Sequence, residues 1–253
     1  MSRLAAVLLL VLAANAAVAG DGPAMPPPAG LEVEREARVV EVIDAGTVLL
    51  DDGETVRLAG IEAPALAQGG ADALAALVQG RRVGLASGGT RRDRYGRLRA
   101  HLVRTDDGAW VQGALLALGL ARVHSLVDDR AAVADMLAIE RGARAGRRGI
   151  WSQPRYRVRA AGEAGARLRG FQLVEGRVKA AAVVRGRGYL NFGADWRTDF
   201  TVSFGPRDRR LFEAEGIAVE DYEGRLVRVR GWVQSFNGPM IEATHPEQIE
   251  VLE

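Results

Sequence analysis

Two arginines, Arg57 and Arg97, are the residues of this sequence whose type and placement best suit chemistry. Each guanidinium carries a permanent charge and a planar fork of donors, so two that converge from separate elements can clamp one phosphate group. Arg57 stands directly before a Gly-Ile-Glu-Ala-Pro turn, and Arg97 ends a turn that also holds Arg94 and Tyr95. An arginine in an alternating strand is more often simply exposed, but the turn after Arg57 favours a phosphate site. We therefore take Arg57 and Arg97 as the candidate catalytic pair, with Arg94 and Tyr95 as candidate binding residues.

A set of strands and helices must position this pair. The alternation over 39–50 predicts a long, bent strand in which Gly46 marks a bulge or a sharp corner. The chain then turns and returns as a second strand, which Pro64 ends. The remaining spacing predicts strands at 82–86 and 98–103 and helices at 71–78, 110–118 and 128–144, with Asp128 or Asp129 as the N-cap of the last helix. This order predicts a five-stranded OB-type barrel with packed helices, in a mainly β, α+β fold.

Residues 36–151 also resemble the staphylococcal-nuclease (thermonuclease) family. The matching motifs, in the family's order, are Asp44-Ala45-Gly46-Thr47, Arg57 before Glu62-Ala63-Pro64-Ala65, Asp93-Arg94-Tyr95-Gly96-Arg97, Leu120-Ala121-Arg122-Val123 and Ile150-Trp151. The resemblance implies an OB-type barrel whose ancestral reaction is hydrolysis of nucleic-acid phosphodiesters with Ca²⁺.

The departures from the family's pattern bear on catalysis. In the family, two carboxylates hold calcium and a glutamate activates the attacking water. Here the first ligand position is Gly46, the second is Glu62 and the general-base position is Ala65. A weak metal site of Glu62 with Asp44 remains, or another acid of the hairpin turns substitutes for the lost ligand. Calcium affinity follows the number of charged oxygens, and a missing base costs about 10²–10⁴-fold. The resemblance therefore implies a phosphate clamp with weak or lost hydrolysis.

The segment after Arg122-Val123 leaves a substitute base and base stacking open. His124 is a candidate general base, and it shares no metal-ligand spacing with His101. Ser125 and Val127 take the positions of the family's substrate-stacking tyrosines, so stacking of a base there is in doubt.

The composition and the first residues limit which partners, metal sites and locations the sequence supports. The chain has 253 residues and a formal net charge of +2, which is too small to indicate a nucleic-acid partner by itself. It contains no cysteine, which excludes disulfides and thiolate metal sites. Residues 1–19 read as a signal peptide, with a basic start, an apolar core and a small-residue cleavage site, and 20–35 as a Pro-rich spacer. We expect a periplasmic or secreted protein with no stable membrane span after cleavage, although an uncleaved anchor is the alternative.

The second half of the chain predicts another barrel. Residues 152–169 read as an Arg-rich linker, and 170–253 give three strands, a helix and two strands, which is the OB-fold order. This part resembles small bacterial OB-fold domains of the nucleic-acid-binding type. Its candidate stacking aromatics are Tyr189, Phe192, Trp196, Phe200, Trp232 and Phe236, of which Trp196 is expected to be exposed, and its candidate groove cations are Arg187, Arg197, Arg228 and Arg230. About half of the aromatics must instead face the core.

Three hypotheses follow for function. The first is an exported thermonuclease-family protein that recognises nucleic-acid phosphodiesters, single-stranded DNA or RNA above all, with weak or lost hydrolysis. The second is a non-catalytic periplasmic OB-fold binding or interaction module. The third, suggested only by the retained arginine pair, is a hydrolase of another phosphodiester.

Overall fold

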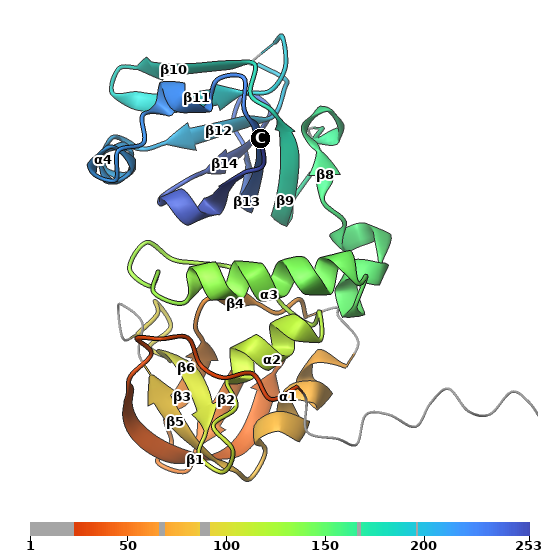
Figure 1. The fold of residues 1–253 in the computed structure, drawn as a ribbon, viewed down its shortest axis with the longest axis vertical. Helices are drawn as coiled ribbons and strands as arrows, with labels where there is room; N and C mark the ends of the chain where they lie inside the picture. The colour runs from red at the N-terminus through yellow and green to blue at the C-terminus, as the bar shows by residue number, and fades with distance from the viewer. Residues whose placement is uncertain (1–22, 66–68, 87–91, 166–167, 196) are drawn as a thin grey trace, which may run out of the picture.

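The computed structural model describes residues 23–65, 69–86, 92–165, 168–195 and 197–253. The predicted signal peptide and Trp196 lie outside these residues. Two β-structures are stacked along the long axis of the molecule, and helix α3 (Val133–Ala145) lies between them (Figure 1). Within the described residues, no helix has the length and apolar character that crossing a bilayer requires.

The N-terminal β-structure is a closed barrel. Its strands are β1 (Val33–Asp44), β2 (Thr47–Leu50), β3 (Thr55–Leu58), β5 (Arg82–Ala86) and β6 (Leu98–Arg104). They are hydrogen-bonded in the order β1-β2-β3-β6-β5, and β3 and β6 form its parallel pair. The alternate apolar residues of these strands, among them Val39, Val48 and Val56, are fully buried in the barrel core. The predicted five-stranded barrel is confirmed.

The predicted single strand over 39–50 is wrong. Asp44 pairs with Thr47, so Ala45 and Gly46 form a tight turn between two strands. The side chain of Asp44 accepts a hydrogen bond from the Gly46 N–H at 2.7 Å, which is an Asx-turn. The Gly46 carbonyl then accepts from the Leu58 N–H at 2.8 Å. The turn is therefore fastened to β3 immediately after Arg57.

Three helices and a short hairpin complete this half. Helices α1 (Gly70–Val78) and α2 (Val111–Ala117) match the predicted segments closely. The predicted N-cap of α3 is wrong, because that helix begins after Ala132 and not at the two aspartates. Asp128 instead pairs with Arg99 at 2.7 Å, and Asp129 is buried beside His101. Strands β4 (Ile61–Glu62) and β7 (Arg122–Val123) pair with each other near the end of β3.

The predicted linker is structured in its described part. The short helix η1 (Gly149–Ser152) leads into it, and it contains the short helices η2 (Pro154–Tyr156) and η3 (Ala161–Glu163) and the strand β8 (Arg159–Ala160). Tyr156 is buried with Trp151, Phe171 and Leu173 in a small core of its own. This packing exists because the segment supplies one aromatic side chain, Tyr156, as well as arginines. The segment thus joins the two halves by apolar contacts.

The C-terminal β-structure repeats the barrel topology. Its elements are β9 (Gly170–Arg177), β10 (Ala180–Val184), β11 (Arg187–Asn191), β12 (Thr201–Phe204), α4 (Pro206–Ala214), η4 (Val219–Tyr222), β13 (Leu226–Ser235), β14 (Pro239–Glu242), η5 (Pro246–Gln248) and β15 (Ile249–Val251). Hydrogen-bonded neighbours follow the order β10-β11-β12-β14-β13-β9, with β8 beside β9 and β15 on β13. Strands β12 and β14 are parallel, as β3 and β6 are.

One predicted strand of this half is broken. The Val178 N–H donates to the Arg225 carbonyl, whereas the Lys179 N–H donates to the Asn191 carbonyl. Because consecutive residues bond to different neighbours, the predicted strand over 171–184 divides into β9 and β10. Together these two take the place that β1 has in the first barrel. The resemblance of 170–253 to bacterial OB-fold domains of the nucleic-acid-binding type stays a prediction, and the strand order is consistent with it.

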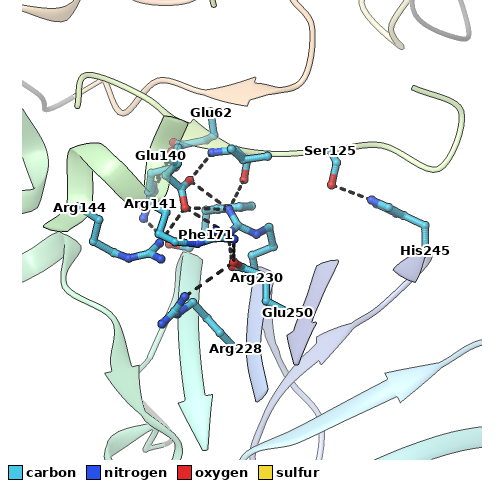
Figure 2. Close-up of polar contacts among 12 residues, drawn as sticks. Glu62, Ser125, Glu140, Arg141, Arg144, Phe171, Arg228, Arg230, His245 and Glu250 are labelled. Atoms are coloured by element: carbon cyan, nitrogen blue, oxygen red, sulfur yellow. Dashed lines mark hydrogen bonds and ion pairs between the residues drawn. The ribbon is translucent and has the colours of Figure 1, made fainter. Parts of the chain in front are cut away.

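A buried ion pair joins the two β-structures. Glu140 of α3 and Arg230 of β13 are both buried, and their Oε2 and Nη1 atoms are 3.0 Å apart (Figure 2). Glu140 also accepts the Val123 N–H at 2.7 Å, and Arg230 donates to the Val123 carbonyl at 3.2 Å and to Glu250 at 2.7 Å. Burial alone would lower the pKa of Arg230, but the Glu140 and Glu250 carboxylates outweigh it and raise the pKa. The guanidinium of Arg230 therefore stays charged.

Two further contacts flank this pair. Arg130 donates to Glu215 at 2.6 Å and to Glu247 at 2.7 Å. Ser125 and His245 are hydrogen-bonded through Oγ and Nε2 at 2.7 Å, and both are buried (Figure 2). Burial is the main reason why the pKa of His245 is lowered to about 4. Arg228 and Arg230, predicted as groove cations, are thus ion-paired, Arg228 with Glu175 at 2.8 Å.

Candidate functional site

Arg57 lies in β3, and Arg97 lies in the turn that leads into the neighbouring strand β6. In the parallel pair β3–β6, Val56 is opposite Leu98 and Arg57 is opposite Arg99. Arg97 directly precedes β6 and lies two residues before Arg99, so its side chain is on the same face as that of Arg57. Burial is the main cause of a lowered pKa at Arg57, the Asp44 carboxylate opposes it, and the positive charge of Arg97 adds to it. The two cations are therefore near enough to act on each other.

Asp93 braces the turn that presents Arg97. One carboxylate oxygen accepts the backbone N–H groups of Tyr95 and Arg97 at 2.9 and 3.0 Å, and the other accepts Nε of Arg97 at 2.7 Å. Tyr95 is 69% exposed, and the guanidiniums of Arg94 and Arg97 lie 4.9 and 5.3 Å from its ring centre. The four residues form an open surface of two cations and one aromatic ring, with Arg97 held in place.

Gly46 leaves the space that the Arg57 side chain occupies. A β-carbon built on Gly46 would overlap Nη1 of Arg57 and lie 2.9 Å from its Cζ. The nearest acid is Asp44, whose Oδ1 is 3.7 Å from Arg57 Nη1. That distance is beyond a hydrogen bond. The position that would hold the first carboxylate of the resembled family is therefore filled by a guanidinium.

The second carboxylate, Glu62, is also engaged by an arginine. Nε and Nη2 of Arg122 donate to the same oxygen of Glu62 at 3.0 and 2.7 Å (Glu62 is labelled near Glu140 in Figure 2). Nη1 of Arg122 donates to the Phe171 carbonyl at 3.0 Å. Arg122 is buried, and its guanidinium lies 4.9 Å from the Phe171 ring centre. Glu62 is thus part of the junction between the two β-structures.

These residues do not fit a calcium ion. Calcium takes six to eight oxygen ligands, and its affinity follows their charge. Asp44 accepts the Gly46 N–H and faces Arg57, while Glu62 faces Arg122. Among the described residues, no three acidic or histidine side chains are grouped as metal ligands would be. Ala65 offers neither a ligand nor a base.

His124 is a histidine near Arg57 and Arg122. Its backbone N–H donates to the Gly60 carbonyl at 2.8 Å. Its ring packs edge-on against Phe171, with ring centres 5.2 Å apart. Burial is the main cause, with the charge of Arg57 next, of a pKa lowered to about 4. The imidazole is therefore neutral near pH 7. Ser125 is buried against His245, which removes it from the surface where the resembled family stacks substrate.

Two features of the site escaped the sequence reasoning. Arg122 lies in the Leu-Ala-Arg-Val motif, but nothing in its spacing identifies Glu62 as its partner. Glu140 lies on the inner face of the predicted helix, and its partner Arg230 was expected in a groove. Each pair joins residues 60 or 90 positions apart.

Comparison with known proteins agrees with this geometry for the first half of the chain. Residues 55–153 match the family model described as staphylococcal nuclease homologue. A search of the curated proteins gave no match. The matched residues contain Arg57, Glu62, Arg97 and the strands of the parallel pair. Together with the closed barrel and its helices, this match shows that residues 55–153 are similar to the staphylococcal nuclease homologue family.

Proposed function

We propose that this protein binds the phosphodiester backbone of single-stranded nucleic acid through Arg57 and Arg97, with weak or lost hydrolysis. The observation that carries the proposal is the placement of Arg57 on β3 and of Arg97 directly before the adjacent parallel strand β6, near enough for their charges to interact. Position 46 beside Arg57 is a glycine, and the general-base position is Ala65. On the strength of residues 1–19, we also propose that the protein is exported, which N-terminal sequencing of the mature protein would test.

The contacts of the two arginines support binding of an anion. Asp44 is 3.7 Å from Arg57, so a phosphate oxygen can take a hydrogen bond that no carboxylate now holds. Arg97 keeps its orientation through Asp93, and its turn adds Arg94 and the exposed ring of Tyr95. In a displacement by water, both guanidiniums would stabilise the charge that builds up on the pentacoordinate phosphorus. No side chain at position 65 would take the proton of that water, which accounts for slow turnover.

The test measures binding of a fluorescent oligothymidylate by anisotropy at several salt concentrations. Wild type is expected to show a steep loss of affinity with salt, because binding releases counterions. Arg57→Ala and Arg97→Ala should each weaken binding and flatten the salt slope by about one ion. Arg177→Ala is the control, since Arg177 is an exposed arginine paired with Glu253 in the C-terminal half.

Cleavage is measured beside binding, with calcium and with a chelator. Weak binding that ignores salt, or full affinity in both arginine variants, would contradict the proposal. It would then favour the non-catalytic interaction module. Rapid calcium-dependent cleavage by wild type would contradict the assignment of weak hydrolysis.

A further inference from the structure

The exposed aromatics of the C-terminal half divide into two places. Of the residues predicted to stack bases, Phe192 and Phe200 are buried in the core. Phe236 is 62% exposed after β13, where it lines an outward groove with Tyr189 and Met240. Trp232 is 52% exposed in the second half of β13, four residues before Phe236, and it is not among the residues that line that groove.

Trp232 lies at the junction with the nuclease-like barrel. Its ring centre is 6.0 Å from that of Phe171 and 6.4 Å from that of His124, both in near-perpendicular arrangements. Such edge-to-face contacts hold a ring in one orientation. Because half of its surface is still exposed, the indole keeps room for a further planar partner.

The same strand is fastened to the barrel two residues earlier. Arg230 of β13 donates to the carbonyl of Val123 and pairs with Glu140, and Val123 directly precedes His124 (Figure 2). Both members of the ion pair are buried. The contact therefore holds β13 beside β7, with Trp232 next to His124.

His124 connects this junction to the arginine pair. Its backbone N–H donates to Gly60, three residues after Arg57, and the charge of Arg57 acts on its ring. The side chains thus follow one another across the boundary between the two halves, in the order Trp232, His124 and Arg57. Cations at one end and an aromatic ring at the other match the alternation of phosphate and base in a single strand.

We propose that Trp232 of the second barrel stacks a base of the single strand whose phosphates lie on Arg57 and Arg97. The inference rests on the proposed function and adds to it a binding residue outside the nuclease-homologue domain. Stacking of this kind tolerates any base, because every base has a π-face. The protein is then a single-strand binder whose binding surface needs both halves.

The experiment compares two fluorescent oligomers of equal length, one of thymidylate and one in which abasic residues replace the bases. Trp232→Ala should weaken binding of the thymidylate oligomer by about five- to a hundredfold and leave the abasic oligomer and the salt slope unchanged. Trp232→Phe, which keeps an aromatic ring against Phe171 and His124, should retain most of the affinity. Phe236→Ala is the matched control, being an exposed aromatic of the same half away from His124.

The outcomes separate this inference from the proposed function. No binding by wild type, or no effect of Arg57→Ala, overturns the proposed function and this inference with it. A loss in Arg57→Ala without a loss in Trp232→Ala overturns the inference alone. An equal loss of both oligomers in Trp232→Ala, or full loss in Trp232→Phe, shows that the tryptophan only supports the fold and also overturns it. A loss confined to Phe236→Ala would move the stacking site to the outward groove.

Discussion

The guanidinium of Arg57 lies against Gly46, in the space that any side chain at position 46 would enter. Because a side chain at position 46 and the guanidinium of Arg57 cannot share this space, the lack of a carboxylate there and the placement of Arg57 depend on each other. An acid at this position would have favoured a cation, whereas the glycine admits a cation of the protein itself. The space beside Gly46 therefore holds a guanidinium where a carboxylate would suit a metal ion.

Gly46→Ala is expected to weaken binding of a single strand by about tenfold, because the new β-carbon displaces Arg57 and loses a charge-assisted hydrogen bond to phosphate. The far end of an arginine moves readily, so the fold should survive. Gly142→Ala is the matched control. A β-carbon on this helical glycine meets nothing within 4 Å, and the change should stabilise α3 by about 1 kcal/mol without altering affinity. Equal affinity of Gly46→Ala and wild type would contradict the placement of Arg57.

Calcium is expected to leave the melting temperature of wild type unchanged. A ligand that binds only the folded state raises the melting temperature, and here Glu62 is held by Arg122 while Asp44 stands alone beside Arg57. Thermal unfolding with excess calcium, with magnesium and with a chelator measures this. A saturable shift with calcium but not with magnesium would show a site that the geometry does not support.

The double variant Gly46→Asp, Ala65→Glu returns a ligand and a base, and it is expected to introduce calcium-dependent cleavage.

The sequence predicts the local part of this architecture well. Alternation and turn residues place β5, β6 and α1 within a residue or two, and the motif around Arg97 includes its brace Asp93. It fails at Gly46, where the pattern does not distinguish a bent strand from a turn between two strands. There the Gly46 N–H donates to the Asp44 side chain, and the chain turns. It fails wholly for the Glu62–Arg122 and Glu140–Arg230 pairs. These partners meet only after the barrels have formed and packed, so no spacing along the chain encodes them.

Arg230→Met is expected to destabilise the protein by about 3–5 kcal/mol, because it leaves Glu140 buried without its main charged partner. Arg144 still pairs with Glu140 at 2.9 Å, so the loss should lie toward the lower end of that range. Urea unfolding gives the free energy, and Arg177→Met is the control. Its exposed pair with Glu253 should contribute less than about 1 kcal/mol. Similar losses in both variants would show that the buried pair does not hold the two halves together.

Stability is expected to fall as the pH drops from about 6.5 to about 4, in part because of His245. The folded pKa of His245 is about 4, whereas that of an unfolded histidine is about 6.5. Between these values the unfolded chain binds a proton that the folded chain refuses, so protonation favours unfolding. Below the folded pKa both states are protonated and the loss levels off. The difference of about 2.5 units corresponds to at most about 3 kcal/mol, and His124 acts in the same direction.

His245→Gln cannot ionise, so its free energy of unfolding, measured in urea at several pH values, should decline less steeply than that of wild type over this window. Parallel curves for the two proteins would mean that His245 is already protonated in the fold, and its hydrogen bond to Ser125 would then have to be reassigned.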